Sequence, residues 1–347
     1  MNQHSRALIS GVLLLAFHAV VVLAGFFAPY NYATQDRLHP HAPPMSAHFF
    51  DCSGKFHFWP FVYGLKDKEG SFGQYERDCD SRYPVRFFAR GDRYAIAGAF
   101  SLDVHLFTVD EPGRIFLLGT DGFGRDQFSR TLYGGQVSLF AGLLAAGICV
   151  AVGMLAGTLA GFYGGWLDAT LMRLAELCIA IPALYLLLAV RSYLPLQVEP
   201  AAAFALVVLV IGSVTWGRPA RLVRGVVLSA RERNFVLAAR GFGASSAYLI
   251  RRHLLPETLS VSLTQLAVLV PQFIMFEITL SFLGLGVGEP FPSWGNLLSQ
   301  AQQYHNLVSY WWLLLPGLAP IPVLMAYYAL STALQRRLDL KGEEIIG

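Results

Sequence analysis

The stretch 234–257 reads NFVLAARGFGASSAYLIRRHLLPE and lies between two long apolar runs of the chain. Ala239 and Gly243 are four residues apart, so they would share one face of a helix. A helix face made of small residues can enter a groove of another protein. Gly241 and Gly243 each weaken an isolated helix by roughly 1 kcal/mol relative to alanine, which favours a short helix–turn–helix closed by Pro256. We expect a docking surface here, and not an active site.

Arginines gather just before and within this stretch. Residues 218–257 contain eight of them, against Glu232 and Glu257 as the acidic residues. Arginine-rich loops of membrane proteins remain on the cytoplasmic side. This segregation explains the basic charge without a nucleic-acid-binding patch. We therefore expect 218–257 to be a cytoplasmic loop, and an ordinary basic loop between two membrane helices is the alternative to a docking surface.

The composition is that of a protein embedded in a lipid bilayer. Hydrophobic residues make up 54% of the 347 residues and charged residues 14%, whereas about 25% charged residues is usual in soluble domains. A hydrocarbon core of ~30 Å is crossed by about 20 apolar residues. The candidate spans lie at about 7–28, 137–162, 167–194, 201–216, 259–285 and 311–334. Six spans place both termini in the cytoplasm.

Several features within these spans carry further expectations. A cleavable signal peptide is the alternative for the first span, but its apolar region would be only about 7 to 15 residues long. In the second span a smooth packing face is expected from Gly153, Gly157 and Gly161. Pro182 should kink the third span. A headgroup belt is expected from Trp294, Trp311 and Trp312.

Residues 31–117 are polar, aromatic and rich in turn-forming residues. We expect a small, mostly β insertion on the outer face, with short strands at 85–88 and 94–97 and a turn at 111–113. Cys52 and Cys79 could form a disulfide there that stabilises the segment by roughly 3 to 4 kcal/mol, and two unpaired thiols are the alternative. The histidines of this segment match no metal-site spacing, so no metal is expected.

Two acidic residues fall inside apolar spans. Charges in membranes are costly and face a bundle interior or a wet cavity, which makes Glu277 the leading and Glu176 the second candidate for the translocation pathway. The alternative is that each is neutral or pairs with a neighbouring helix and braces the bundle. The sequence contains no G-x-x-x-x-G-K-[ST], G-x-S-x-G or H-E-x-x-H motif, so no catalytic residue is assigned.

The order of residues in 234–257 resembles the "EAA" coupling loop of bacterial ABC-importer permeases, through which the membrane subunit meets its ATPase. Two positions depart from the general pattern, because Leu237 stands at the glutamate and His253 at the isoleucine. AAR and RHLLP spellings are typical of the peptide and nickel branch of these permeases. The resemblance implies that the ATPase-coupling residues are Ala238, Ala239, Gly243, Arg251, Arg252, His253, Leu255 and Pro256.

A second stretch, 119–139, resembles the GTDxxGRDxxSRxxxGxxxSL signature that opens the second span in one of the two permeases of oligopeptide and dipeptide importers. Its glycines allow tight turns and its charges can pair, so a bracing role is expected over substrate contact. The signature residues are Gly119, Thr120, Asp121, Gly124, Arg125 and Asp126. The segment 292–298 resembles the outer re-entrant or interfacial stretch of the same permeases.

Together these resemblances imply an all-α polytopic membrane protein with six transmembrane helices, the type I ABC-importer permease fold. We expect a division into a first helix at 1–30, the insertion at 31–117, a permease core at 118–340 with the coupling loop 218–257, and a cytoplasmic tail at 341–347. The resemblance covers the first span and residues 117 to about 340, and its motifs do not explain the insertion from 31 to 110. The implied place is the bacterial inner membrane.

The implied function is a permease subunit, not an enzyme, that forms half of the translocation pathway for di- or oligopeptides. Its expected partners are a second homologous permease, two ATPase subunits and an extracytoplasmic solute-binding protein. No cofactor is bound by this chain, because ATP and Mg would be held by the ATPase. Import of nickel or another small solute, and a membrane receptor with an external ligand-binding subdomain, remain the alternatives.

Overall fold

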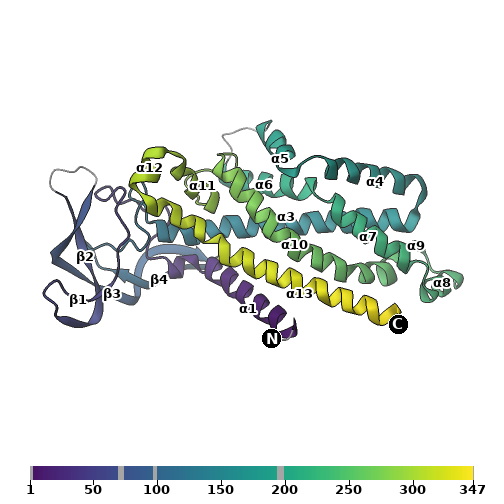
Figure 1. Cartoon of the computed structure of the whole chain (residues 1–347), viewed down its shortest axis with the longest axis horizontal. Coiled ribbons are helices and arrows are strands. Elements are labelled where there is room, and N and C mark those ends of the chain that lie inside the picture. Colours follow the sequence, from purple (N-terminus) through teal and green to yellow (C-terminus); the bar gives the residue numbers. More distant parts are fainter. Residues whose placement is uncertain (1–2, 69–73, 97–99, 194–198, 347) are drawn as a thin grey trace. The chain divides into compact units, whose positions relative to one another are not determined.

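The structure, a computed structural model, describes residues 3–68, 74–96, 100–193 and 199–346. It is mostly helical and divides into two compact units (Figure 1). One unit comprises Met1–Leu14, Phe140–Leu280 and Pro322–Gly347, and the other comprises Leu15–Leu139 and Ser281–Ile321. The elements in chain order are α1 (Gln3–Val22), α2 (Ala24–Phe27), β1 (His48–Phe50), β2 (Phe56–Asp67), β3 (Tyr75–Ile96), β4 (Phe100–Val109), α3 (Gln127–Tyr163), α4 (Gly165–Ala180), α5 (Ala183–Ser192), α6 (Pro200–Val214), α7 (Gly217–Ala230), α8 (Asn234–Gly241), α9 (Ser246–Leu249), η1 (Ile250–Leu254), α10 (Leu255–Phe282), α11 (Trp294–Ser299), η2 (Gln300–Gln302), α12 (Tyr304–Ser309), η3 (Trp311–Leu318) and α13 (Pro320–Ile346).

Three helical stretches are long and apolar enough to cross a membrane: Gln127–Tyr163, Ser246–Phe282 and Trp311–Arg336. The count rises to five if each of two bent helix pairs is one span. The first expected span is divided at Leu23 between α1 and α2, and its apolar helical part, Ala7–Val22, is shorter than the others. The described residues therefore hold three to five candidate spans by length and composition.

Both bent pairs break where the sequence weakens the helix. The pair α4 and α5 is bent by 91° at Ile181 and Pro182, as the proline predicts, because Pro182 cannot donate a backbone hydrogen bond. The pair α6 and α7 is bent by 46° at Thr215 and Trp216. The end of the third predicted span, Leu194, lies outside the described residues.

The predicted glycine face of α3 is a packing seam against α7. A Cβ on Gly153 would lie 2.6 Å from the Cβ of Pro219, and one on Gly157 would lie 2.4 Å from the carbonyl oxygen of Ala220. A Cβ on Gly161 would lie 2.9 Å from Val227. The two helices therefore approach at a distance that only glycine permits, as in other membrane helix pairs with small residues at four-residue spacing.

The insertion contains a four-stranded antiparallel sheet with the order β1-β2-β3-β4. The two short strands expected at 85–88 and 94–97 are parts of the one long strand β3, whose pairing with β4 is shifted between Arg90 and Tyr94; Ala97 lies outside the described residues. The expected turn is present, since the amide of Gly113 donates to the carbonyl of Asp110 at 2.9 Å. A β-rich insertion is thus confirmed.

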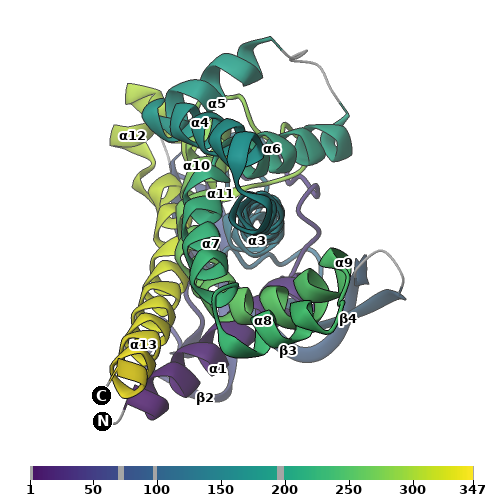
Figure 2. The ribbon, with the colours of Figure 1, turned by 90° about the vertical axis from the view of Figure 1, so that its right-hand side faces the viewer.

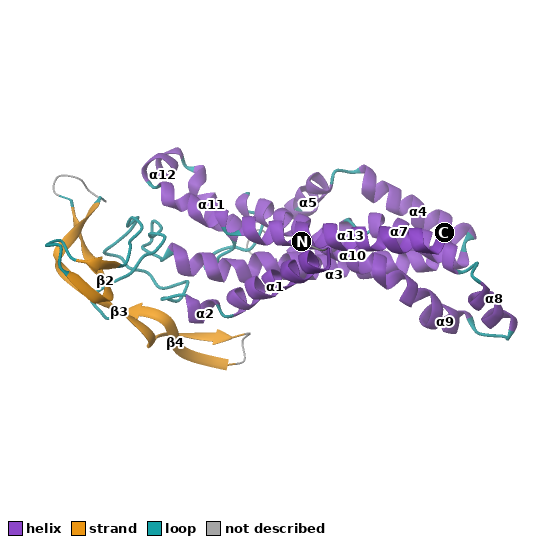
Figure 3. Cartoon of the chain, turned by 60° about the horizontal axis from the view of Figure 1, so that its bottom comes forward, coloured by secondary structure: helices purple, strands orange, loops and turns teal. Residues whose placement is uncertain are grey.

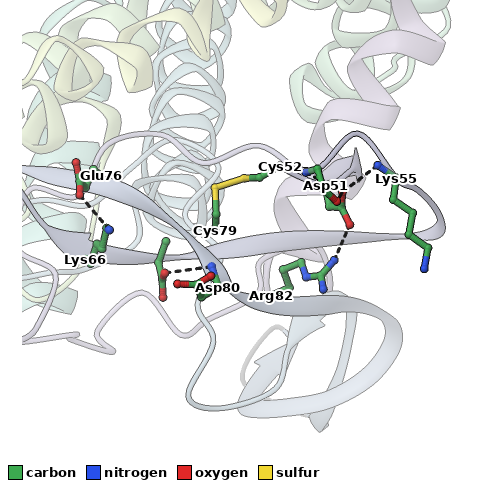
Figure 4. Close-up of a disulfide and its surroundings, with 10 residues drawn as sticks. Asp51, Cys52, Lys55, Lys66, Glu76, Cys79, Asp80 and Arg82 are labelled. Atoms are coloured by element: carbon green, nitrogen blue, oxygen red, sulfur yellow. Dashed lines mark hydrogen bonds and ion pairs between the residues drawn. A yellow bond between two sulfur atoms is a disulfide. The ribbon is translucent and has the colours of Figure 1, made fainter.

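A disulfide joins Cys52, in the turn after β1, to Cys79 in β3, with 6.1 Å between their Cα atoms (Figure 4). Beside it Asp51 accepts a hydrogen bond from Arg82 at 2.9 Å, and Lys66 pairs with Glu76 at 3.2 Å (Figure 4). These links connect three strands at the end of the sheet.

Only one of the three tryptophans expected in a headgroup belt is exposed. Trp311 is 57% exposed, whereas Trp294 and Trp312 are buried. The Trp294 indole donates to the carbonyl of Thr131 at 3.0 Å, and that of Trp312 donates to the carbonyl of Thr120 at 3.2 Å. The belt assignment is therefore wrong for these two, because an indole N–H inside a fold needs a carbonyl partner and finds one here.

Candidate functional site

The predicted helix–turn–helix is present as α8 and α9, which we call the elbow (Figure 2). Helix α8 ends at Gly241, and Gly243 follows with φ of +83°. The amide of Ala244 donates to the carbonyl of Ala239, and the amide of Gly243 to that of Arg240. This pair of bonds is the Schellman motif, in which a glycine in the left-handed region stops the helix. Because the helix stops, Ala239 and Gly243 do not share a helix face as we expected.

The second arm of the elbow does not end at Pro256, so that part of the expectation is wrong. Ser245 caps α9 by accepting from the amide of Tyr248. The chain then passes through the π-turn Ile250–Leu254, where the amide of Leu255 reaches back to Ile250, directly into α10. Pro256 lies inside this continuous helix directly after the π-turn, a turn that departs from the regular backbone hydrogen bonds that a proline interrupts. The elbow is therefore continuous with a long apolar helix.

A hydrophobic cluster anchors the elbow to α3 and α7. Its buried members are Phe162, Val223, Val227, Ala230, Val236, Leu249 and Leu254, and Ala239 and Ala244 pack against it. Polar contacts surround this cluster: Arg231 donates to the carbonyl of Gly161 at 3.0 Å, Arg233 pairs with Glu257 at 3.1 Å, and the Arg240 guanidinium lies 5.7 Å from the Phe162 ring centre. The arginines of the loop thus hold the elbow in place.

The outer side of the elbow is apolar and exposed. Phe242, at the turn, is 93% exposed, and Leu237 and Ala238 are exposed on α8. The His253 ring lies 5.6 Å from the rings of both Phe235 and Tyr248, which are themselves exposed. We call this set, with the exposed Arg251 and Arg252, the elbow surface. A rigid surface of aromatic and arginine side chains is typical of protein interfaces.

Among the expected coupling residues, Ala238, Arg251 and Arg252 lie on this surface, and His253 lies between two of its rings. Ala239 and Leu255 are half-buried, so they shape the elbow from within. The motif identified the helix and the turn. It missed the exposed aromatic residues, although a phenylalanine directly beside a turn glycine is a visible sign of a surface apolar group.

The signature loop lies in the other unit and is built on two glycines in the left-handed region. Gly119 and Gly124 both have φ of +73°, and a Cβ on Gly124 would lie 1.8 Å from the carbonyl oxygen of Asp36. Between them the Thr120 hydroxyl donates to the carbonyl of His39 and accepts from the amide of Ala42, each at 2.7 Å. The loop is therefore fastened to 36–42, the segment before the sheet.

The charges of the loop form a network in which Asp121 and both arginines are buried and the shared acid, Glu289, is half-exposed. The Arg125 Nε donates to Asp121 at 2.7 Å, and its two terminal nitrogens donate to Glu289 at 2.7 and 3.2 Å. Arg130, which is fully buried, donates to the same Glu289 at 2.9 Å. Glu289 is 164 residues from Arg125 in the sequence, so no local pattern pointed to it. The network ties the start of α3 to the loop that precedes α11, which supports the bracing role.

The carboxyl group of Asp126, in the same loop, has a raised pKa. Burial raises the pKa of its carboxyl to about 7, although hydrogen bonds from the amide and hydroxyl of Ser129 oppose the shift. Ser129 in turn accepts from the amide of Tyr30 at 3.3 Å. Through Ser129, Asp126 is thus linked to the backbone of Tyr30, just after α2.

Of the two candidate pathway acids, Glu176 is exposed and pairs with Arg173 at 3.2 Å. It lines a cavity of about 470 Å³ together with the ion pair of Asp168 and Arg224, whose Nε and Oδ1 atoms lie 2.5 Å apart. Glu277 is fully buried in α10. Glu277 is not among the residues that line this cavity.

A second cavity of about 300 Å³ lies where the two bent helix pairs meet α10. Pro182 and Ala183 come from the first bend, Thr215 and Arg218 come from the second, and Gln272 comes from α10. Gln272 was not among our candidates. It could have been found, because a polar residue inside an apolar span faces protein or water by the argument that was applied to Glu277.

Comparison with known proteins gives two family matches. The model for the binding-protein-dependent transport system inner membrane component matches residues 153–341, and that for the N-terminal TM domain of oligopeptide transport permease C matches residues 2–44. The Dipeptide transport system permease protein DppC of Bacillus subtilis (strain 168) is 38% identical over 224 residues, which are 64% of this chain and 68% of that protein.

A putative peptide permease protein of Brucella suis biovar 1 (strain 1330) is 35% identical over 226 residues, which are 65% of this chain and 73% of that protein. Among solved structures, an inward-facing form of the MetNI methionine ABC transporter matches 58% of this chain and 94% of its own with a TM-score of 0.43 and 19% identity.

Proposed function

The chain belongs to the family of binding-protein-dependent transport system inner membrane components, and we propose that it forms half of the translocation pathway of a bacterial importer for peptides. It is a permease subunit of an ABC importer, a multi-pass inner membrane component that is not itself catalytic. ATP binds to separate ATPase partners, and a binding protein is implied by the family. The cargo is proposed from the peptide and dipeptide permeases that this chain resembles.

The finer assembly is part of the proposal. Six spans result if α1 with α2 is one span and each bent pair is another, and both termini are then cytoplasmic. A second homologous permease completes the pathway, and two ATPase subunits hold ATP and Mg. The signature loop braces the outer end of α3 and does not touch cargo, a role supported by the burial of Arg125 and Arg130.

The observation that carries the coupling role is the elbow surface. Phe242 is almost fully exposed on a turn that a Schellman motif, a hydrophobic cluster and three arginines fix in place. An exposed aromatic group on a rigid turn loses little conformational entropy when a partner covers it. The elbow lies within the part of the chain that matches the family model, residues 153–341. We assign it to the ATPase interface.

Cargo is tested by uptake. Vesicles that contain this chain with its companion permease and ATPase subunits, supplied with the binding protein and ATP, should accumulate a labelled dipeptide or a longer peptide. Accumulation of Ni²⁺ with no peptide uptake would replace the peptide assignment by the metal alternative. Absence of ATP-dependent uptake of any solute, in a complex that hydrolyses ATP, would contradict the importer assignment itself.

We propose that the cavity lined by Gln272 faces the cargo. Glu277 is buried, so its charge either acts in the pathway or holds neighbouring helices together. Gln272→Leu should change the uptake rate or the range of cargo in assembled complexes. Glu277→Gln keeps the shape and removes the charge. Unchanged uptake by assembled Glu277→Gln complexes would exclude a pathway role for this charge, and failure to assemble would support the bracing role.

A further inference from the structure

The hairpin formed by β3 and β4 is attached to α2, at the end of the first apolar helix (Figure 3). A Cβ on Gly25 of α2 would lie 2.3 Å from the Tyr94 ring, so the ring rests directly on the helix backbone. His105 of β4 is buried, and its Nδ1 and Nε2 atoms lie 2.6 and 2.8 Å from the carbonyl oxygens of Ala28 and Asp92. The hairpin is therefore fixed to α2.

The length of the first helix determines where α2 and the attached hairpin lie across the bilayer. Its apolar part, Ala7–Val22, has 16 residues, which span about 24 Å at 1.5 Å per residue. A hydrocarbon core is ~30 Å thick. Under the proposed topology, α2 therefore lies at the boundary between the hydrocarbon and the outer headgroups, and the hairpin lies there with it.

One face of the hairpin is apolar beyond the point of attachment. Tyr94 is paired with Leu102, and Ile96 is paired with Phe100, so these four side chains lie on one face. Phe100 is 71% exposed and Leu102 is 45% exposed. The face thus begins at the ring that rests on α2 and continues outward as an uncovered apolar surface.

A third exposed group joins this surface to the helix. Phe88 of β3 is 66% exposed, has φ of +52° and lies with its ring centre 6.1 Å from that of Phe26 in α2. The positive φ is unusual for a residue with a large side chain. We call Phe88, Phe100 and Leu102 the hairpin patch.

Charge on the same strand favours a phospholipid surface over another apolar partner. Arg90 is 85% exposed at its side chain, with Asp103 at 3.9 Å, and Arg93 is also exposed. Asp92, between them, accepts hydrogen bonds from the amide of Asn31 and the hydroxyl of Thr34. Two exposed guanidinium groups next to exposed aromatic side chains match the layers of phosphate and hydrocarbon at a membrane interface.

We propose that the β3–β4 hairpin is a second membrane anchor, whose hairpin patch enters the outer leaflet at the headgroup boundary while Arg90 and Arg93 meet lipid phosphates. The proposal rests on the membrane topology of the proposed function. The hairpin holds the sheet of the insertion close to the bilayer.

Spin-label accessibility tests this placement. The variant chain carries Cys149→Ser and Cys178→Ser and one new cysteine in place of Phe100, Leu102 or Phe58, is labelled with a nitroxide, and is placed in nanodiscs of phosphatidylcholine and phosphatidylglycerol. Phe58 is the matched control, because it is 85% exposed on β2 and lies outside the hairpin patch. Labels at 100 and 102 should collide with oxygen several-fold more, relative to a water-soluble nickel chelate, than the label at 58.

Equal chelate accessibility at 100, 102 and 58 would overturn the proposal. So would labels at 100 and 102 that are aqueous in the chain alone and become shielded from both reagents in the complete transporter, since that result identifies a protein as the occupant. The amount of ATPase that the complete labelled transporter retains tests the proposed function separately. A preparation that retains ATPase but shows aqueous labels refutes the anchor alone.

Discussion

Gly241 and Gly243 are exposed, and a Cβ on either would meet open space, yet their backbones differ. Gly241 is the last residue of α8, whereas Gly243 has φ of +83°. Gly243→Ala should open the elbow, because an alanine in the left-handed region costs about 1 to 2 kcal/mol. Gly241→Ala should leave it intact or stabilise α8 by up to about 1 kcal/mol.

Hydrogen exchange of the α8 and α9 amides measures this difference between the two glycines. Faster exchange in Gly243→Ala and unchanged or slower exchange in Gly241→Ala is the expected result. If both variants exchange alike, the Schellman turn does not determine the stability of the elbow.

Asp126 should make the unit that contains the signature loop less stable as pH rises. Its pKa is about 7 in the folded protein, against an ordinary value of 3.8, so the folded state retains a proton that the unfolded state has lost. This contribution is fully present below pH 4 and is lost as pH rises through about 7, at an order of a few kcal/mol. Asp126→Asn keeps an acceptor for Ser129 and removes the titration.

Thermal unfolding at pH 5 and pH 8 reports the effect of Asp126. The wild type should lose more stability between these pH values than Asp126→Asn does, and the difference between the two proteins isolates this group from all others. An identical pH dependence would show that Asp126 is not protonated in the folded state at pH 5.

Single residues also show how much of the structure can be predicted from the sequence. Pro182 was interpreted correctly as a bend, and Gly243 correctly as part of a turn but wrongly as sharing a helix face with Ala239, because both residues act through their own backbone. Pro256 was misread, since the helix does not end there but continues through the π-turn into α10. Glu289 was missed, because its role exists only through two arginines that are distant in the chain.

At the scale of helices, α3 offers a matched pair of glycines for the packing seam. A Cβ on Gly157 would lie 2.4 Å from the Ala220 carbonyl oxygen, whereas a Cβ on Gly147 meets nothing within 4 Å. Gly157→Ala should therefore separate α3 from α7 and destabilise the protein by about 1 to 3 kcal/mol, the usual cost of overpacking. Gly147→Ala should be neutral or stabilising.

Unfolding of the two purified variants in detergent distinguishes the seam from a general effect of helix propensity. A lower midpoint for Gly157→Ala alone is expected. A similar midpoint for both variants would mean that α7 moves away from α3 without cost.

The elements themselves were predictable to different degrees. Long apolar helices such as α3 and α10 follow from composition alone, because their length exceeds that of any buried soluble helix of the same character. The union of two expected strands into the 22-residue β3 was not predictable. Pairing with β2 at one end and with β4 at the other makes it one strand, and those partners are set by the tertiary fold.

At the scale of the whole molecule, two features bear on transport: the elbow surface and the cavity lined by Gln272. The elbow surface is aromatic and basic, and the packing of the elbow against α3 and α7 fixes it in place. The cavity lined by Gln272 adjoins both helix bends. Helix α7 contributes both to the hydrophobic cluster of the elbow and to this cavity, and α10 lines the cavity and pairs with the elbow loop through Glu257 and Arg233.

Coupling through the elbow is tested most directly by the amount of ATPase that remains bound to purified permease complexes. Phe242→Glu places a charge on the most exposed point of the elbow surface, and Phe58→Glu makes the same change on a phenylalanine of the insertion that is 85% exposed. Burying an unpaired charge in an interface costs several kcal/mol, and each 1.4 kcal/mol is tenfold in an equilibrium constant. Phe242→Glu should therefore retain at least tenfold less ATPase, with matching loss of ATP-driven uptake, while Phe58→Glu retains the wild-type amount. Equal retention in both variants would contradict coupling through the elbow.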